Sequence, residues 1–223
     1  VTTYNTNEKY LKKQIDSILK QTYKNIKIYI SDDNSPNTKV AEILKQYKEL
    51  DDRIELYIQP KNLGYNKNFE FLLKQSKANY IMFSDHDDIW HKDKVEKSLT
   101  KLKEKDVDMV YCNCRQVDED GIVLHDDYFK YKNVPLVDGK SKLAISRCVG
   151  IGCSQIITKS VRDKMIPFKK NFIAHDWLAG FIANEGLSII ENAGLMGLPL
   201  PESICQAIDV LKRHSQNTIE KQT

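Results

Sequence analysis

The stretch Tyr80-Ile81-Met82-Phe83-Ser84-Asp85-His86-Asp87-Asp88-Ile89-Trp90 places three carboxylates directly after a short apolar run. The apolar run predicts a buried strand, and residues 92–104 beyond the acids predict a helix. Ligands of open α/β sheets bind where the strands end at their carboxyl edge, so the acids lie where a site would form. Asp85 and Asp87 are separated by one residue and offer hard oxygen ligands, which suit Mg²⁺ or Mn²⁺ bound to substrate phosphates. A solvated turn that caps the next helix explains the motif alone about as well.

Strand and helix patterns alternate in the residues that precede this stretch. Apolar residues alternate as in strands at 26–30 and 54–58, and they recur at helical spacing at 11–19, 40–47 and 69–73. Residues 1–5 look like the end of a strand whose earlier part is missing, and Asn7 is the expected N-cap of the first helix. This rhythm predicts successive right-handed βαβ units, and therefore an α/β fold with a mainly parallel central sheet sandwiched by helices.

The second half of the chain is less regular. Its pattern predicts strands at 109–114 and 155–158, a hairpin turn at Asp118-Glu119-Asp120-Gly121, a polar loop at 126–142 and a helix at 173–184. Short strands and turns are expected after Gly186, with residues 204–213 either helix or strand. Because no repeat, linker or low-complexity tract interrupts the chain, we expect one domain over residues 1–223.

The composition is that of an ordinary globular protein, with 41% hydrophobic and 29% charged residues among 223. A net charge of +3, from 34 basic and 31 acidic side chains, is too balanced to indicate a nucleic-acid partner. No apolar run approaches the roughly 18–20 residues that cross a bilayer. Five cysteines without paired C-x-x-C spacing fit a reducing cytoplasm better than a zinc site or disulfides.

A second acidic pair, Asp32-Asp33, follows the strand pattern at 26–30 and precedes Asn34-Ser35-Pro36. An Asx-turn explains this loop about as well as a function does. Thr2-Thr3-Tyr4-Asn5 is expected at the same edge of the sheet. Together the two segments could hold a base, because the tyrosine ring stacks and a carboxylate accepts one ring N–H.

Several motifs occur in an order that resembles the inverting nucleotide-sugar glycosyltransferases of family two. The segments that carry the resemblance are Thr2-Thr3-Tyr4-Asn5, Ile18-Leu19-Lys20-Gln21-Thr22-Tyr23, Ser31-Asp32-Asp33-Asn34-Ser35 and Ser84-Asp85-His86-Asp87-Asp88-Ile89-Trp90. His175-Asp176-Trp177 and Arg213-His214-Ser215-Gln216-Asn217 resemble motifs of that family's bacterial cell-surface polysaccharide branch, which includes rhamnosyltransferase-like members. The resemblance spans nearly the whole chain and is most specific in the first 100 residues, whereas residues 194–211 depart from the pattern.

The resemblance implies a GT-A fold with a divalent metal cofactor, Mn²⁺ or Mg²⁺. It assigns the donor nucleotide to Thr2, Tyr4, Asp33, Lys67 and Asp85, the metal to Asp87 and Asp85, and the catalytic base to Asp176. Within the metal pair, Asp87 is the more direct ligand and Asp85 lies closer to the ribose. For His214, a further metal or phosphate contact and an ordinary surface histidine remain equally open.

These assignments predict transfer of a sugar from a UDP- or dTDP-sugar to an acceptor hydroxyl, with inversion and with metal assistance. The pyrimidine preference follows because an Asp33 carboxylate accepts from the N3–H of uracil or thymine, which cytosine lacks. About residues 1–115 would form the nucleotide-sugar-binding half and about residues 116–223 the acceptor-binding half, where Gly150 and Gly152 could let the backbone approach an acceptor.

The expected acceptor is a glycan or a lipid-linked glycan. The transfer would belong to bacterial polysaccharide or cell-surface glycan synthesis. The protein would act in the cytoplasm, where it could attach peripherally to the inner face of the membrane. Two other functions stay open. A sugar nucleotidyltransferase usually has a glycine-rich phosphate loop after its first strand, and residues 4–8 contain no glycine. A non-catalytic nucleotide- or glycan-binding scaffold is the second alternative.

Overall fold

The computed structural model describes residues 1–133, 151–168 and 174–183. In its first part the helices and strands are β1 Thr2–Thr3, α1 Glu8–Leu19, β2 Ile28–Asp32, α2 Thr38–Leu50, β3 Ile54–Ile58, α3 Tyr65–Gln75, β4 Tyr80–Met82 and α4 Lys94–Lys105. They are followed by β5 Met109–Tyr111, β6 Gln116–Val117, β7 Val123–His125, α5 Tyr128–Tyr131, the 3₁₀ turn η1 Gly152–Ser154, β8 Gln155–Thr158, α7 Lys159–Met165 and α8 His175–Ala183. The predicted alternation of strands and helices is confirmed, and Asn7 caps α1 by accepting a hydrogen bond from the backbone N–H of Lys9.

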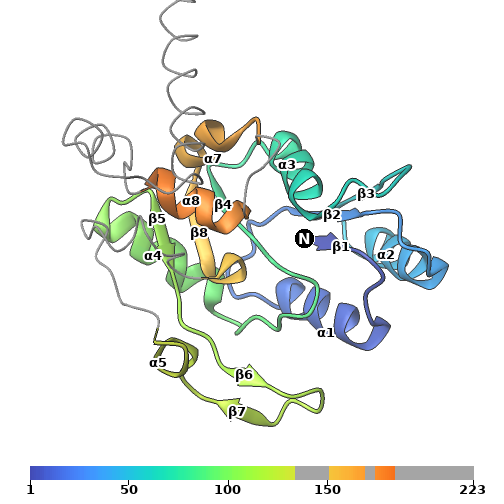
Figure 1. Cartoon of the computed structure of the whole chain (residues 1–223), viewed down its shortest axis with the longest axis horizontal. Helices are drawn as coiled ribbons and strands as arrows, with labels where there is room; N and C mark the ends of the chain where they lie inside the picture. Colours follow the sequence, from blue (N-terminus) through green and yellow to red (C-terminus); the bar gives the residue numbers. More distant parts are fainter. Residues whose placement is uncertain (134–150, 169–173, 184–223) are drawn as a thin grey trace, which may run out of the picture.

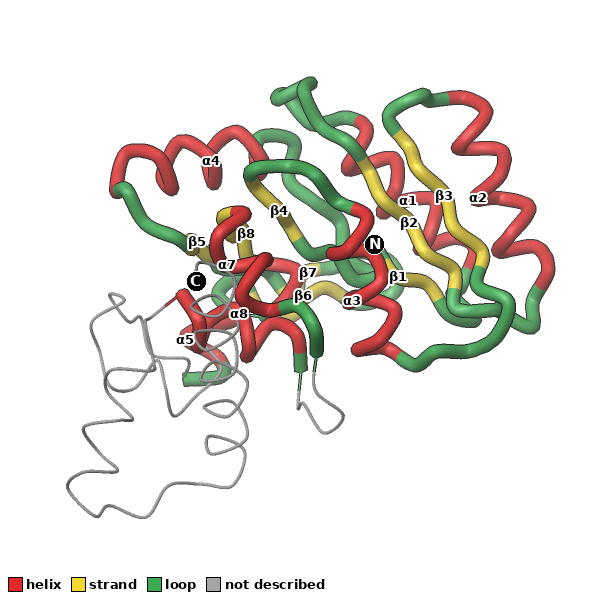
Figure 2. The backbone as a smooth tube through the Cα atoms, turned by 90° about the horizontal axis from the view of Figure 1, so that it is seen from above, coloured by secondary structure: helices red, strands yellow, loops and turns green. Residues whose placement is uncertain are grey.

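The first sheet is parallel, with the strand order β1-β2-β3. Side chains of β2 alternate between two faces, as the period of a strand requires. Ile28 and Ile30 pack with apolar residues of α1 and α2, whereas Ser31 faces α3 and bonds to Asn68. Helices therefore cover both faces of this sheet, as Figures 1 and 2 show.

The second sheet has the order β4-β8-β5 and lies beside the first in both views (Figures 1 and 2). β8 runs antiparallel to both of its neighbours, with Ile156 opposite Met82 and Val110. The expected parallel pairing thus holds for β1, β2 and β3, while β8 enters between β4 and β5 in the opposite direction. A local apolar run predicts that residues 155–158 form a strand but carries no information about strand direction.

A small hairpin of β6 and β7 extends away from both sheets in Figure 1. Its turn is the predicted one, with Gly121 at φ +88° and its N–H donated to the carbonyl of Asp118. Residues 126–142 were expected to be a loop, but Tyr128–Tyr131 form α5, whose N-cap Asp127 accepts from the N–H of Lys130. A four-residue helix is too short to leave a periodic apolar pattern, which explains the difference.

None of the described helices combines the length and the apolar character that crossing a bilayer requires. The segments expected after Gly186 lie outside the described residues.

Candidate active site

The acid-bearing loop joins β4 to α4 and is fixed to the first helix. Gln14 of α1 is fully buried, and its Nε2 donates to the hydroxyl of Ser84, at 2.8 Å, and to the carbonyl of Asp85. At the other end of the loop, Trp90 packs in the core beneath α1, and its backbone N–H donates to Ser17 Oγ at 2.9 Å. The loop is therefore held at both ends.

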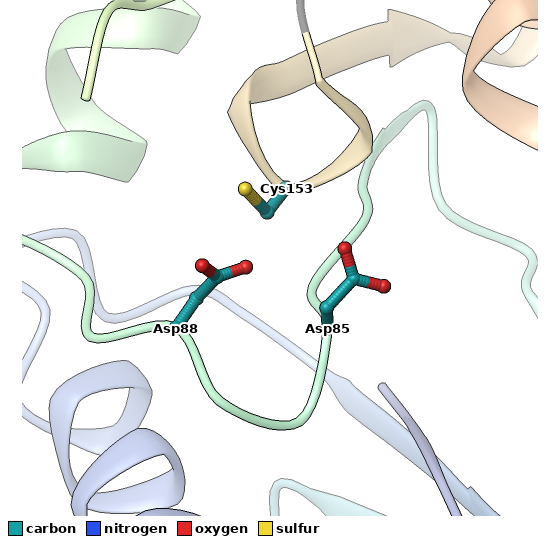
Figure 3. A group of neighbouring side chains, drawn as sticks. All are labelled: Asp85, Asp88 and Cys153. Carbon is teal, nitrogen blue, oxygen red and sulfur yellow. The ribbon is translucent and has the colours of Figure 1, made fainter. Parts of the chain in front are cut away.

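Two acids of this loop meet a cysteine from a distant part of the chain. The ligand atoms of Asp85, Asp88 and Cys153 all lie within 4.8 Å of one another (Figure 3). The Cys153 thiol hydrogen-bonds to Asp88, while Asp88 Oδ2 is buried and has no hydrogen-bond partner among the described residues. Asp87 is not part of this group, and its side chain is 63% exposed.

Burial and mutual repulsion perturb the acids of this loop. The pKa of Asp85 rises to about 6, first because the side chain is buried and then because of the charges of Asp88, Asp87 and Asp176. Burial also raises the pKa of Asp88, and Lys94 opposes that shift. A cation at this position would relieve the repulsion, because an opposite charge favours the ionised carboxylates.

Asp176 lies in the first turn of α8 and belongs to the same site. Burial raises the pKa of the Tyr65 hydroxyl, and the charges of Asp85 and Asp176 raise it further. The same hydroxyl donates to Asp85 at 3.4 Å, and Asp176 adds to the raised pKa of Asp85. Both carboxylate oxygens of Asp176 accept backbone hydrogen bonds, Oδ1 from Trp177 at 2.8 Å and Oδ2 from Gly152 at 3.2 Å. The carboxylate predicted to be the base is thus held in one orientation at the edge of the acid loop.

His175 is part of the core and is not available to a sugar. Its ring is 1% exposed, and both ring nitrogens lack a hydrogen-bond partner among the described residues. Burial lowers its pKa to about 4, so the imidazole is neutral at pH 7. Phe69 and Phe83 cover the imidazole, so it cannot pack on a sugar ring.

The residues predicted to hold the nucleotide come from several elements: Thr2 and Tyr4 lie in and after β1, Asp33 follows β2, Lys67 lies in the first turn of α3, and Asp85 follows β4. Thr2 is buried, whereas Tyr4 and Lys67 are exposed. Asp33 is 3% exposed and accepts backbone hydrogen bonds from Leu63 at 2.7 Å and Gly64 at 2.9 Å. Asp33 thus fixes the loop that leads into α3. His214, the further predicted metal contact, lies outside the described residues.

Asp32 forms a turn, which is one of the two explanations that the sequence left open for this acidic pair. Its carboxylate accepts from the backbone N–H and the hydroxyl of Ser35 and from the hydroxyl of Thr3, and it is 1% exposed. The Asp32 side chain therefore closes a turn onto Ser35, three residues on, and its role is structural.

Sequence reasoning gave no role to several residues that complete the site, namely Gln14, Tyr65, Asp88 and Cys153. The acidic run signalled Asp88 as a third carboxylate. Nothing local signalled Cys153 or Gln14, because they reach the acid loop from η1 and α1.

An apolar cavity of about 550 Å³ lies between β2 and β4 and is lined by residues such as Ile28, Leu72 and Met82. Its lining does not include the carboxylates of Asp85, Asp88 or Asp176. The acid loop, and not this cavity, is the candidate active site.

The sequence profile of Glycosyl transferase family 2 matches residues 1–165. The chain belongs to this family. The profile of the Bacteriophage holin family matches residues 140–213, many of which lie outside the described residues.

Curated relatives of this family 2 chain are also named as glycosyltransferases. It is 29% identical to the uncharacterized glycosyltransferase MJ1057 of Methanocaldococcus jannaschii, over 82% of this chain and 63% of the relative. It is 37% identical to glycosyltransferase GlyA of Streptococcus pneumoniae, over 62% of this chain and 20% of GlyA. TuaG of Bacillus subtilis, named provisionally for teichuronic acid biosynthesis, is 30% identical over 55% of this chain and 48% of TuaG. The chain therefore spans less than two thirds of the length of these relatives.

Solved structures confirm the GT-A fold expected for the family. Residues 1–349 of S. aureus TarS, in complex with UDP, superpose with a TM-score of 0.63 at 19% identity, over 82% of this chain and 53% of the TarS chain. The mannosyltransferase PcManGT of Pyrobaculum calidifontis, in complex with GDP-Man and Mn²⁺, superposes with a TM-score of 0.61 at 14% identity, over 91% of this chain and 53% of that chain.

Proposed function

We propose that this family 2 chain transfers a sugar from a UDP- or dTDP-sugar to an acceptor hydroxyl, with inversion at the transferred carbon. The observation that carries the proposal is the position of Asp176 beside the acid loop. Asp176 Oδ2 accepts from the N–H of Gly152 at 3.2 Å, and the thiol of the next residue, Cys153, lies within 4.8 Å of the Asp85 and Asp88 carboxylates. A base and a phosphate-binding edge in one site are what glycosyl transfer from a nucleoside diphosphate requires.

Asp176 is the proposed general base. It removes the proton from the acceptor hydroxyl as that oxygen attacks the sugar carbon, which contributes roughly 10²–10⁴-fold to the rate. Inversion follows if this single base acts on the face opposite the leaving group. Its two backbone hydrogen bonds leave further lone pairs free to receive a proton, because a carboxylate has about four acceptor positions.

The acid loop fits a divalent cation. Its donors are mainly carboxylate oxygens, Asp88 Oδ2 is buried without a partner in the part of the chain that the structure describes, and the carboxylates repel one another. We propose that Asp85 and Asp87 hold Mn²⁺ or Mg²⁺ together with the donor's phosphates, that Asp88 supports them, and that His214 adds a contact. When bound, the ion stabilises the negative charge that develops on the departing diphosphate.

The nucleotide would lie against Thr2, Tyr4, Asp33 and Lys67. Tyr4 is 50% exposed, so its ring is free to stack on a base. Lys67 is exposed and would contact a phosphate of the donor. Asp33 already accepts two backbone hydrogen bonds, yet each oxygen keeps one acceptor position for the N3–H of uracil or thymine. The TarS complexes with UDP and UDP-GlcNAc support a uridine nucleotide.

The acceptor is proposed to be a glycan or a lipid-linked glycan of the bacterial cell surface. The name of TuaG, with its teichuronic acid assignment, supports this class. The reaction would take place in the cytoplasm, at the inner face of the membrane when the acceptor is lipid-linked.

Release of nucleoside diphosphate tests the proposal. The protein is incubated with UDP-, dTDP-, GDP- and CDP-sugars, each with Mn²⁺ and with a chelator, and the released nucleotide is measured. We expect release of UDP or dTDP only with the metal, and loss of release in Asp176→Asn. Asp52→Asn is the matched control, because Asp52 is exposed and precedes the N-terminal end of β3, at the opposite edge of the sheet. Binding of UDP without release from any donor would favour the non-catalytic scaffold instead.

A further inference from the structure

We propose that the dipeptide Gly152–Cys153 is a positioning element that sets the distance between the base Asp176 and the metal-binding loop. The inference rests on the proposed function and adds a positioning role for two residues to which that function assigns no part in the chemistry. Gly152 contacts Asp176, and Cys153 contacts Asp88. One dipeptide therefore touches both halves of the proposed machinery (Figure 3 shows its contact with the acid loop).

Gly152 holds Asp176 from one side and leaves no room for a side chain. Its N–H donates to Asp176 Oδ2 at 3.2 Å. A Cβ atom built on Gly152 would lie 2.7 Å from His175 Nε2 and 3.3 Å from Asp176 Cβ. Since His175 is wedged between Phe69 and Phe83, it cannot move away, and any side chain at 152 would displace the first turn of α8.

Cys153 holds the acid loop from the other side. It is 7% exposed, its thiol hydrogen-bonds to Asp88, and its carbonyl accepts from Lys94 Nζ at the start of α4. The thiol is a donor here and no nucleophile, because burial and the charge of Asp88 raise its pKa.

The dipeptide is itself mounted on rigid structure. It leads directly into β8, which pairs with β4 and β5. The carbonyl of Ser154 accepts from the N–H of Cys112, at 3.1 Å, and Gln155 Nε2 donates to the carbonyl of Asp176, at 3.2 Å. A rigid mount matters because misplacing a reacting group by about 1 Å can lower a rate about 100-fold.

Gly152→Ala tests the position of the base. We expect kcat for sugar transfer to fall by about 100-fold, while the Kd for UDP with Mn²⁺, measured by calorimetry, stays unchanged. Gly180→Ala is the matched control in α8, the helix that carries Asp176, because a Cβ there would meet only Met109 Cε, at 3.8 Å, among the described residues. It should keep both quantities.

Cys153→Ser and Cys153→Ala test the other contact. Serine keeps a donor to Asp88 and should retain UDP and Mn²⁺ binding, whereas alanine removes the donor and should weaken binding by about tenfold. The two Cys153 variants test the positioning role even if Gly152→Ala fails to fold, as judged by circular dichroism.

The two proposals fail in different ways. If the wild-type protein releases nucleotide but Gly152→Ala keeps its kcat, or Cys153→Ala binds like Cys153→Ser, the positioning role is refuted and the proposed function stands. If the folded wild-type protein releases nothing from any donor, the proposed function is refuted and the positioning role with it.

Discussion

The imidazole of His175 lies flat on the phenyl ring of Phe69, with the ring centroids 3.9 Å apart and the planes at 19°. This stack joins the first turn of α8 to the middle of α3, and Phe83 closes it from the side of β4. Because Asp176 is the next residue, its backbone is fixed by apolar packing in the core. The position of the proposed base therefore depends on packing between α8 and α3, which are distant in sequence.

His175 makes the stability of the protein depend on pH. Its pKa is about 4 in the folded protein, below the ordinary value of 6.5, so between these values the unfolded chain binds a proton that the folded chain does not. Stability contributed by neutral His175 is therefore present above pH 6.5 and is lost as the pH falls. We expect the free energy of unfolding to be about 2 kcal/mol lower at pH 5 than at pH 7 from this residue alone.

Urea unfolding of wild type and His175→Phe across this range measures the effect. Asp85, whose pKa is raised to about 6, acts in the opposite sense, so the difference between the two proteins is the informative quantity. The control is His125→Phe, since His125 also stacks on a ring, that of Tyr131, but lies half-buried on the hairpin. A pH slope that is the same in all three proteins would contradict the prediction.

Asp87 and Asp176 should have separable effects. Asp87→Ala is expected to abolish metal-dependent binding of the donor, because a ligand of the phosphate-bridging cation is lost. Asp176→Ala is expected to leave donor binding intact and to remove transfer. Calorimetry with UDP and Mn²⁺, followed by a transfer assay, distinguishes them. Equal loss of donor binding in both variants would show that the two roles are not separate.

Asp33 should matter for both stability and base recognition. Asp33→Ala removes the acceptor of two partly buried backbone N–H groups, so we expect a loss of roughly 1–3 kcal/mol in urea unfolding. Asp126→Asn, on the exposed hairpin, should change stability by less than about 0.5 kcal/mol. In wild type, UDP should bind more tightly than CDP, and equal affinities would rule out the proposed contact with N3–H.

Lys67 and Asn68 are neighbours on α3, and we expect substitution of the first to affect UDP binding and substitution of the second to affect stability. Lys67→Ala should weaken UDP binding and leave the melting temperature unchanged, because the side chain is exposed. Asn68→Ala should cost about 2 kcal/mol of stability, since the buried amide pairs with the hydroxyl and carbonyl of Ser31. Melting curves and calorimetry on both variants check this. A destabilised Lys67→Ala protein that binds UDP normally would reverse the assignment.

Local patterns in the sequence were sufficient for the alternating α/β order and for the acid loop at the end of β4. Periodicity and capping residues act within a few positions, so the N-cap of α1 at Asn7 and the hairpin turn at Gly121 could be predicted. The direction of β8 could not, because an apolar run looks the same whichever way the strand runs.

The content of the site was decided by tertiary structure. Asp88 meets Cys153, and Asp176 meets Gly152, only because β8 lies between β4 and β5 and carries η1 to the acid loop. The burial of His175 and the exposure of Asp87 have the same origin, since each depends on what packs against the residue and not on its neighbours in the chain. The sequence by itself determined which residues are able to do the chemistry, and the packing of distant segments decided which of them lie together and how they ionise.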